Sequence, residues 1–340
     1  MNKILITGVG GYIGSIAAYL FLQNGYEVVG LDNFLTGYHD PVELLKKKFP
    51  ETFSFYESDL KDDLSPIFEK EKRDEKAPFD AVVHFAASCV VDESMSNPYK
   101  YFDNNPRGAL NLVDTLVKLK VRKIVVSSTC AVYGEAKYVP LDENHPVAPN
   151  NTYGESKYME EQIVRWYGQL KGMEYVVFRY FNVSGASDDS LFGYSKNPST
   201  HLTENAVRGA LGIKPFYLTY QEMDTPDKSP VRDYVNVVDL CEAHIKAVEY
   251  LLGGGKSETI NLGTGTGNSV LEIISQVEKF TGAKIPRQKS SSLRGGEASK
   301  LVATIDKAKK LLGWEPKRTI ADSVKSLVAW YKAHPNGWEK

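Results

Sequence analysis

The sequence predicts an α/β fold in which helices cover both faces of a doubly wound parallel sheet. Short apolar runs alternate with amphipathic stretches over residues 3–126, and this alternation is typical of right-handed strand–helix–strand units. A glycine turn joins the first apolar run to the first amphipathic stretch, as in sheets that bind a ligand at their carboxyl edge. The alternation ends near Asn182, so we expect a smaller C-terminal α/β domain that binds the substrate.

The composition excludes several classes of protein. The formal net charge over 340 residues is −2, so no basic surplus points to nucleic acid or an anionic membrane as a partner. No apolar run approaches the roughly 18 residues of a membrane span, and the N-terminus lacks a secretory signal pattern. We therefore expect a cytoplasmic protein. The 3 cysteines are too scattered for a disulfide framework or a metal site, and no metal is expected.

The first strand and helix carry a glycine pattern suited to a dinucleotide. Residues 3–7 form an apolar run, and Gly8, Gly11 and Gly14 follow at intervals of three before a helix that ends near Asn24. Glycine permits a tight turn, a close approach to a diphosphate and close packing of strand against helix. The free N–H groups at the helix start attract the anion. These observations predict a dinucleotide-binding Rossmann fold.

The next three strands each end in residues suited to a cofactor. The strand at residues 27–31 ends in Asp32 and Asn33, and an acid at this position binds ribose hydroxyls and repels a 2′-phosphate, which favours NAD over NADP. Asp59 and Leu60 follow the strand at 53–56, where the acid can meet the adenine edge or cap a helix. Small residues of the run Phe85, Ala86 and Ala87 follow the strand at 80–84 and allow a cofactor to pass close by.

Hydroxyl groups follow the strand at residues 122–126. Ser127 and Thr129 lie there, at the edge where open α/β sheets bind ligands, although such hydroxyls can also cap backbone groups. Tyr153 and Lys157 come later and are four residues apart, so they share one face of a helix. An ammonium beside a phenol favours the phenolate. Because the glycine turn, Thr129 and Tyr153 would meet at one edge of the sheet, we interpret the pair as catalytic.

The second half is less regular. Residues 184–230 are rich in Gly, Ser, Asn and Pro and are predicted to be irregular, as a substrate-binding segment. Residues 253–257 imitate a phosphate loop, but they follow a helix and lack its first glycine. The chain from Ala303 onward is predicted to be helical, with its tryptophans packed inside. We expect residues 1–183, with 235–262 returning to them, to form the first domain, and 184–234 with 263–340 to form the second.

The motifs resemble those of the extended short-chain dehydrogenase/reductase family, and within it those of the UDP-sugar 4-epimerases. The match runs nearly end to end, and it includes the motifs Thr7-Gly-Val-Gly-Gly-Tyr-Ile-Gly14, Leu31-Asp-Asn33, Val83-His-Phe-Ala-Ala87, Asp103-Asn-Asn105, Ser127-Ser-Thr129, Tyr153-Gly-Glu-Ser-Lys157, Arg179-Tyr-Phe-Asn182 and Val231-Arg-Asp-Tyr234. The Tyr-x-x-x-Lys motif marks the superfamily. The Arg-Tyr-Phe-Asn and Arg-Asp-Tyr motifs are more specific to members that act on sugar nucleotides.

The resemblance implies the chemistry. It implies epimerisation at C4 of a UDP-hexose through a 4-keto sugar, with a bound NAD that is not consumed. Tyr153 would take the proton of the 4-hydroxyl, Thr129 would bind the 4-oxygen, and Lys157 would hold the nicotinamide ribose and lower the pKa of Tyr153.

The resemblance also implies the binding residues. The residues implied for NAD are Gly8, Gly11, Tyr12, Ile13, Gly14, Asp32, Asn33, Asp59, Leu60, Phe85, Ala86, Ala87, Asn105, Ser127, Tyr153, Lys157, Tyr180 and Phe181. The residues implied for the UDP-sugar are Thr129, Asn182, His201, Leu202, Arg232, Tyr234, Arg294, Glu297 and Leu301. The helices over residues 98–120 and 152–170 are the pair that relatives use to form a homodimer.

Several positions depart from the family pattern, and all lie near the expected substrate. The departures are Cys89 in place of a lysine, Thr219 in place of a uracil-stacking phenylalanine, Asn236 in place of a histidine and Glu297 in place of an aspartate. Leu301 falls where the family controls access of N-acetylated sugars, and its size favours sugars without the acetyl group.

Three other functions stay open. The chain could epimerise another UDP-sugar, namely an N-acetylated hexosamine, a pentose or a uronate. It could be a related dehydratase or decarboxylase, although Cys130 and Ala131 stand where a dehydratase usually has an acidic pair. It could also be a non-catalytic sensor or scaffold that binds NAD, which the intact Thr129, Tyr153 and Lys157 disfavour.

Overall fold

The main body of the protein is a parallel sheet with helices on both faces. The computed structural model describes residues 1–72, 76–220, 222–289 and 299–338. Its 7-stranded sheet has the order β11-β6-β5-β4-β1-β2-β3, and each neighbouring pair is parallel. The strands are β1 (Lys3–Thr7), β2 (Glu27–Asp32), β3 (Phe53–Glu57), β4 (Ala81–His84), β5 (Lys123–Thr129), β6 (Glu174–Tyr180) and β11 (Glu258–Leu262). The predicted doubly wound fold is confirmed.

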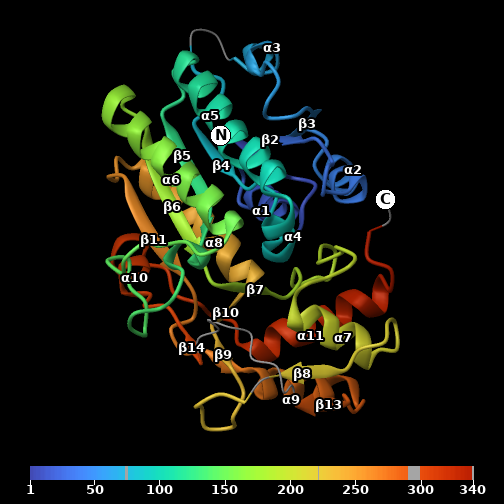
Figure 1. Ribbon diagram of the computed structural model, residues 1–340. Helices are drawn as coiled ribbons and strands as arrows, with labels where there is room; N and C mark the ends of the chain where they lie inside the picture. The colour runs from blue at the N-terminus through green and yellow to red at the C-terminus, as the bar shows by residue number, and fades with distance from the viewer. Residues whose placement is uncertain (73–75, 221, 290–298, 339–340) are drawn as a thin grey trace.

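Two helical layers enclose this sheet because its strands are apolar on both faces. Ile4 and Ile6 of β1 pack with the layer of α1 (Tyr12–Gln23) and α8 (Val237–Leu252). Leu5 points the other way, toward α5 (Pro98–Lys118) and α6 (Thr152–Lys171). Figure 1 shows α5 and α6 side by side over one face of the sheet. The shorter helices around the sheet are α2 (His39–Lys48), α3 (Ser65–Lys70), α4 (Val91–Ser96) and α10 (Asp306–Leu312), with a 3-10 turn η1 (Cys130–Tyr133).

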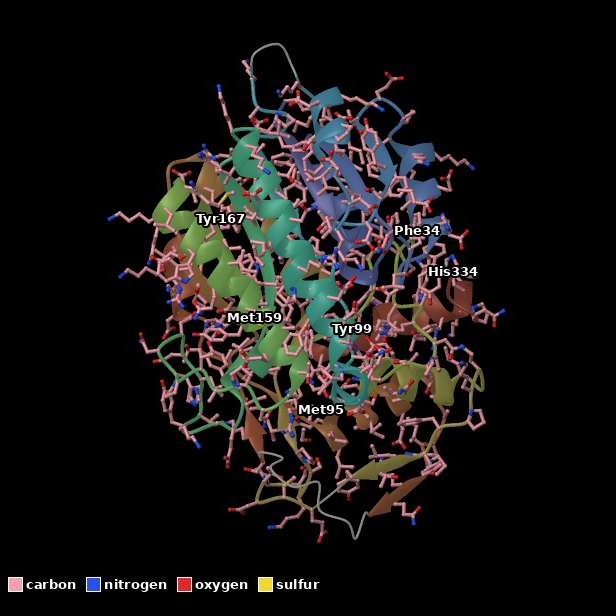
Figure 2. The ribbon with its side chains drawn as sticks, turned by 45° about the horizontal axis from the view of Figure 1, so that its top comes forward. Phe34, Met95, Tyr99, Met159, Tyr167 and His334 are labelled. Carbon is pink, nitrogen blue, oxygen red and sulfur yellow. The ribbon has the colours of Figure 1, made fainter. Side chains whose placement is uncertain are left out.

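The outer face of the α5–α6 layer carries apolar side chains in solvent. Tyr99 is 77% exposed, Trp166 59% and Leu170 70%. Figure 2 shows Tyr99 and Met159 on these two helices, with Met95 close by on α4. Isolated apolar side chains are common on surfaces, and here several gather over two adjacent helices. None of the described helices is long and apolar enough to cross a bilayer.

The order of the strands reverses direction beside β1. The chain moves from β1 outward to β2 and β3, then crosses back to β4 on the other side of β1. Loops that leave β1 and β4 therefore diverge and open a crevice at the carboxyl edge, which is where open α/β sheets bind ligands.

A second unit lies beyond the carboxyl edge of the sheet (Figure 1). Its helices are α7 (Leu202–Ala210), α9 (Val270–Thr281) and α11 (Ile320–Ala333), and they share one apolar core. Its short strands form pairs and a three-stranded sheet: β7 (Asn182–Ser184) with β10 (Tyr234–Asn236), β8 (Leu218–Tyr220) with β13 (Arg287–Lys289), and β9 (Val231–Arg232) between β12 (Asn268–Ser269) and β14 (Lys300–Leu301). The domain boundaries stay a prediction.

Two local predictions were wrong. Residues 184–230 are more regular than predicted, because they contain α7 and β8. Ala206 and Val207 are buried against α9 and α11, and tertiary burial thus stabilises a helix that the polar composition concealed. The second error concerns Ser127 and Thr129, which belong to β5 and pair with β6 instead of lying in a loop. The helix predicted after residue 303 is confirmed as α10 and α11, and Trp314 and Trp330 are buried.

Candidate active site

A cavity of about 890 Å³ follows the carboxyl edge of the sheet and extends into the second unit. Residues that follow β1, β2, β3, β4 and β6 line it, together with Ser127, Ser128 and Thr129 at the end of β5. Every described residue predicted for the site lines this cavity except Asn105 and Leu301. Arg294 and Glu297 lie outside the described residues.

The glycine turn at β1 is too tight for side chains. Gly8 has φ +77°, in the left-handed region that favours glycine. A Cβ on Gly14 would lie 2.0 Å from the Gly8 carbonyl oxygen, and one on Gly8 would lie 2.7 Å from the Ala86 nitrogen. No side chain caps the start of α1, so its first N–H groups are available to an anion. The turn therefore fits the diphosphate of a dinucleotide.

Asp32 is held at the end of β2 by backbone N–H groups. Its side chain is 7% exposed and accepts hydrogen bonds from the N–H of Gly10 and of Phe34, both at 2.8 Å. Burial raises the pKa of this carboxyl, and the backbone donors oppose the shift. Asn33 donates to Asp59 over 2.9 Å, so the acids predicted for the ribose and the adenine lie beside each other.

Tyr153 lies at the start of α6, where local hydrogen bonds hold it. Asn151 caps the helix by accepting the Gly154 N–H at 2.8 Å, and the Tyr153 N–H donates to Ser94 Oγ at 3.1 Å. Burial holds the pKa of the Tyr153 phenol well above its usual value, and the Thr129 hydroxyl opposes that shift. Tyr153 and Thr129 both line the cavity. The free protein therefore holds Tyr153 as a neutral phenol.

Lys157 makes a contact that the sequence analysis missed. Its Nζ lies 2.5 Å from Oε2 of Glu160, and both side chains are almost completely buried. Burial raises the pKa of Glu160 to about 7, and Lys157 opposes that shift. Within the described chain no hydrogen bond joins Lys157 to Tyr153. The spacing of three residues on one helix face is the signal that would have identified Glu160.

Glu160 belongs to a row of buried polar side chains that also contains His84 and Thr7. His84 Nε2 lies 3.8 Å from Glu160 Oε2, and His84 Nδ1 lies 2.7 Å from the Thr7 hydroxyl. Burial lowers the pKa of His84 to about 3, so this imidazole is neutral. His84 is a packed core residue with an exposure of 1%.

The second unit contributes the other wall of the cavity. Asn182, His201, Leu202, Arg232 and Tyr234 all line it. The surroundings of His201 lower the pKa of its imidazole through desolvation and the nearby charge of Lys196, although 40% of the side chain is exposed. Of the positions that depart from the family pattern, Cys89 and Thr219 line the cavity. Asn236 does not line it; its side chain caps α8 and donates to Ser323 Oγ at 2.9 Å.

Glu204 is a cavity residue that the sequence analysis did not identify. It lies in the first turn of α7, is 1% exposed, and neither carboxylate oxygen has a hydrogen-bond partner. Burial raises its pKa to about 8, so the carboxyl is mostly neutral near pH 7. Nothing local in the sequence signals this, because the residue becomes buried only when α7 packs below the cavity.

Asn105 and Leu301 lie behind the cavity wall. Asn105 is buried and clamps Ser88, a lining residue, by accepting its N–H at 2.7 Å and donating to its carbonyl at 3.0 Å. Leu301 belongs to β14 and packs in the apolar cluster of Tyr133 and Phe181. Asn105 and Leu301 therefore support lining residues, Ser88 and Phe181, without lining the cavity themselves.

The parallel sheet, the glycine turn and the helix of Tyr153 and Lys157 meet at one cavity, which is the architecture of the short-chain dehydrogenase/reductase class. A family model described as GDP-mannose 4,6 dehydratase matches residues 5–327. A UDP-glucose 4-epimerase of Lactobacillus helveticus is 40% identical to the chain over 339 residues, which is 99% of each protein. The chain therefore belongs to the extended short-chain dehydrogenase/reductase family, in which its curated relatives are UDP-glucose 4-epimerases.

Solved structures agree with this assignment. A crystal structure of UDP-glucose 4-epimerase superposes with a TM-score of 0.93 at 38% identity and covers 100% of both chains. The UDP-glucose 4-epimerase of Bifidobacterium longum, crystallised with NAD+ and UDP, superposes with a TM-score of 0.89 at 33% identity, covering 98% of this chain and 99% of that one.

Proposed function

We propose that the protein interconverts UDP-galactose and UDP-glucose by inverting C4 of the hexose with a bound NAD. The observation that carries the proposal is the shared cavity, in which Tyr153 and Thr129 face the same space as the glycine turn and Asp32. The full-length relationship to UDP-glucose 4-epimerases supports the choice of substrate.

In this proposal the residues of the dinucleotide half hold NAD. The turn of Gly8, Gly11 and Gly14 receives the diphosphate, and Asp32 accepts hydrogen bonds from the adenosine ribose. A bound NAD would supply the acceptor for the hydride of C4 and the donor that returns it to the opposite face of the resulting 4-keto group. Tyr12, Ile13, Asn33, Asp59, Leu60, Phe85, Ala86, Ala87, Ser127, Tyr180 and Phe181 line the rest of the site, and Asn105 supports it from behind.

Tyr153 is the proposed base and acid at the sugar 4-oxygen. A phenolate that takes the 4-hydroxyl proton must form inside a buried site, and burial opposes its formation. A nearby cation stabilises it, and Lys157 is the cation on the same helix face. Glu160 holds that ammonium in a fixed position, while Thr129 donates to or accepts from the 4-oxygen.

The UDP part is proposed to lie against the second unit. Asn182, His201, Leu202, Arg232 and Tyr234 line that wall; Arg294, Glu297 and Leu301 keep their proposed roles from the resemblance. An arginine suits a diphosphate because its planar fork binds two oxygens.

The test is a product assay on the purified protein. Incubation with UDP-galactose should yield UDP-glucose by NMR, without net formation of NADH, and with NAD that co-purifies with the protein. UDP-xylose, UDP-glucuronate and the N-acetylated sugars test the other substrates in parallel. A 4-keto-6-deoxy product would assign a dehydratase instead, and absence of any product with NAD bound would favour a sensor.

We also propose that the protein is a cytoplasmic homodimer. The exposed apolar side chains over α5 and α6 support a face that a second copy covers, and they are Tyr99, Phe102, Leu110, Met159, Trp166 and Leu170. Tyr99 and Met159 are labelled in Figure 2. Their spacing places them along the outer side of the two helices.

A further inference from the structure

We propose that Lys196 binds the diphosphate of the dinucleotide from the side opposite the glycine turn. In this proposal residues 187–200 form a strap that closes over the cofactor, and Lys196 is its ligand. The inference rests on the proposed NAD-dependent function, and it adds a cofactor contact from the part of the chain assigned to the substrate.

The strap is bonded directly to the glycine turn through one tyrosine. The N–H of Tyr38 donates to the Gly10 carbonyl at 2.9 Å, and the Tyr38 hydroxyl donates to the Ser195 carbonyl at 3.0 Å. Ser195 immediately precedes Lys196. The backbone of Lys196 is therefore one side chain away from the turn that fits a diphosphate.

Further contacts anchor the strap on both sides of the cavity. On the dinucleotide side, the Tyr19 hydroxyl donates to Asp189 Oδ2 at 2.7 Å, and the ring of Tyr12 meets that of Tyr194 edge-on at 5.2 Å. On the other side, Trp330 Nε1 and the Tyr331 hydroxyl both donate to the Tyr194 carbonyl, at 3.2 Å and 2.9 Å. Because both α1 and α11 hold the strap, the backbone of Lys196 is fixed relative to the cavity.

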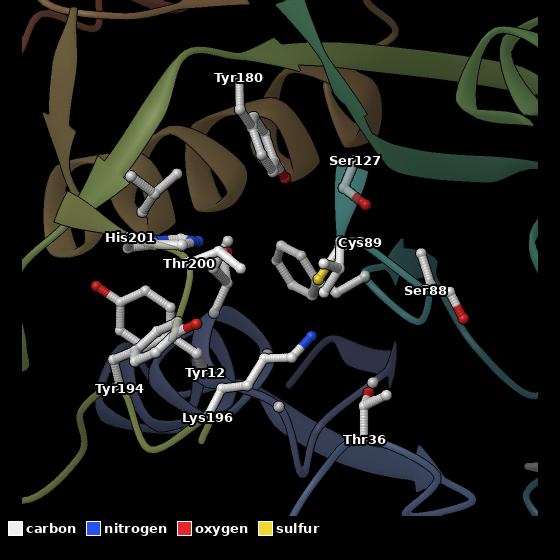
Figure 3. A pocket seen from close by; sticks show the side chains of 18 of the residues that line it. Tyr12, Thr36, Ser88, Cys89, Ser127, Tyr180, Tyr194, Lys196, Thr200 and His201 are labelled. Carbon is white, nitrogen blue, oxygen red and sulfur yellow. The ribbon is translucent and has the colours of Figure 1, made fainter. Parts of the chain in front are cut away.

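The Lys196 side chain points into the cavity. It is half-buried and lines the same space as Gly10, Gly11 and Tyr12. In the view of Figure 3 it extends from the strap into the cavity, toward the side where Cys89 and Thr36 lie. Within the described residues its ammonium forms no hydrogen bond and no ion pair. The charge of Lys196 attracts Glu93 only through space, and a cation at a cavity wall that makes no ion pair with a described carboxylate is suited to an anionic ligand.

Among the described residues, the other lysine and arginine side chains that line the cavity are those of Lys157 and Arg232. Lys157 is ion-paired with Glu160, and Arg232 lies on β9 in the second unit. The first turn of α1 carries no charged side chain. Backbone N–H groups and the helix dipole carry only partial charges, so a full positive charge from Lys196 complements the two charges of a dinucleotide diphosphate.

A nucleotide sugar also carries a diphosphate, so the ligand has two possible sources. The bonded path from Gly10 through Tyr38 to Ser195 favours the diphosphate of the dinucleotide. If Lys196 binds the dinucleotide, removal of its charge weakens the retention of NAD; if it binds the nucleotide sugar, removal weakens the affinity for UDP.

The experiment compares the variants Lys196→Met and Lys196→Arg with the control Lys284→Met, a lysine whose side chain is 90% exposed. The exchange of protein-bound NAD with radiolabelled NAD is followed on the purified protein, at low and at high salt, and the Kd for UDP is measured by calorimetry on the same samples. Circular dichroism melting checks that each variant is folded.

We expect Lys196→Met to accelerate NAD exchange about tenfold at low salt, since a charge-assisted phosphate contact is lost. The difference should shrink near 1 M salt, and Lys196→Arg should restore most of the retention. The Kd for UDP should stay within about twofold of the parent value, because a group that binds the other diphosphate contributes little to it.

Two outcomes would overturn the inference. The first is unchanged NAD exchange in Lys196→Met, and a weaker affinity for UDP in that variant would then assign Lys196 to the other diphosphate. The second is equal acceleration in the Met and Arg variants with no dependence on salt. Failure of the proposed function is distinguishable, because it appears as a parent protein that neither binds NAD nor converts a sugar nucleotide.

Discussion

At the scale of single residues, Tyr153 is the group on which the proposed reaction depends most. It lines the cavity with Thr129, and its burial makes the neutral phenol the resting form. Replacement of a general base typically costs about 10²- to 10⁴-fold in rate. Tyr153→Phe should therefore lower kcat by about 10³-fold, while NAD content and the Kd for UDP stay unchanged.

The matched control is Tyr158→Phe on the next turn of the same helix. The Tyr158 hydroxyl accepts a hydrogen bond from Gln162 at 2.8 Å and does not line the cavity. This variant should retain its rate. Near-normal turnover by Tyr153→Phe would contradict the assignment of the base.

Glu204 makes a prediction about stability and pH. Its pKa is raised by burial to about 8 in the folded protein, against about 4.3 in an unfolded chain. The folded state thus favours the protonated carboxyl. The stabilisation that comes from this raised pKa is fully present below pH 4 and is lost as the pH rises to 8. The free energy of unfolding falls by roughly 1.4 kcal/mol per pH unit over this range, and by several kcal/mol at most.

Glu204→Gln should therefore gain free energy of unfolding relative to the parent as the pH rises from 5 to 8.5. Urea unfolding at both pH values measures this difference. Glu51→Gln, at an exposed position, is the control and should change little. An equal effect of Glu204→Gln at pH 5 and pH 8.5 would show that the carboxyl titrates normally.

At the scale of elements, the join between β1 and α1 depends on the absence of side chains. A Cβ on Gly14 would lie 2.0 Å from the Gly8 carbonyl oxygen, which is backbone and has no room to move. Gly14→Ala should destabilise the fold by about 1–3 kcal/mol, the usual cost of overpacking, and should lower the amount of bound NAD.

Gly253→Ala is the comparison for this variant. Gly253 ends α8 at an ordinary φ of −77°, and a Cβ there would lie 3.3 Å from the Glu249 carbonyl of the preceding turn. Its Tm should fall little. A Gly14→Ala protein with parental Tm and full NAD content would contradict the tight packing of this turn.

At the scale of the whole molecule, the apolar outer face of α5 and α6 makes a prediction about assembly. Trp166 is 59% exposed and Leu110 45%, and charges there would oppose burial against a second copy. The double variant Trp166→Glu and Leu110→Glu should be monomeric by light scattering and remain folded by circular dichroism.

Tyr217→Glu serves as the control for that variant, because Tyr217 is 65% exposed but lies in the second unit. It should leave the mass unchanged. A monomeric parent protein would refute the proposed dimer outright.

The dinucleotide half of the site was predictable because its chemistry follows from local spacing. Gly8, Gly11 and Gly14 are placed by a strand, a turn and a helix that adjoin in the chain. Asp32 comes at the end of the next parallel strand, which must lie beside the first. Tyr153 and Lys157 share a helix face by periodicity alone. Local geometry therefore decided which of these residues face the cavity.

Only the tertiary structure decided the charges around those residues. Glu160 meets Lys157 inside the molecule, Glu204 loses its solvent when α7 packs onto α9 and α11, and Lys196 is brought to the glycine turn by Tyr38. Burial and pairing of charges depend on segments far apart in the chain. The sequence by itself thus determined the fold, the family and the reactive pair. The long-range packing determined how the site is charged and closed.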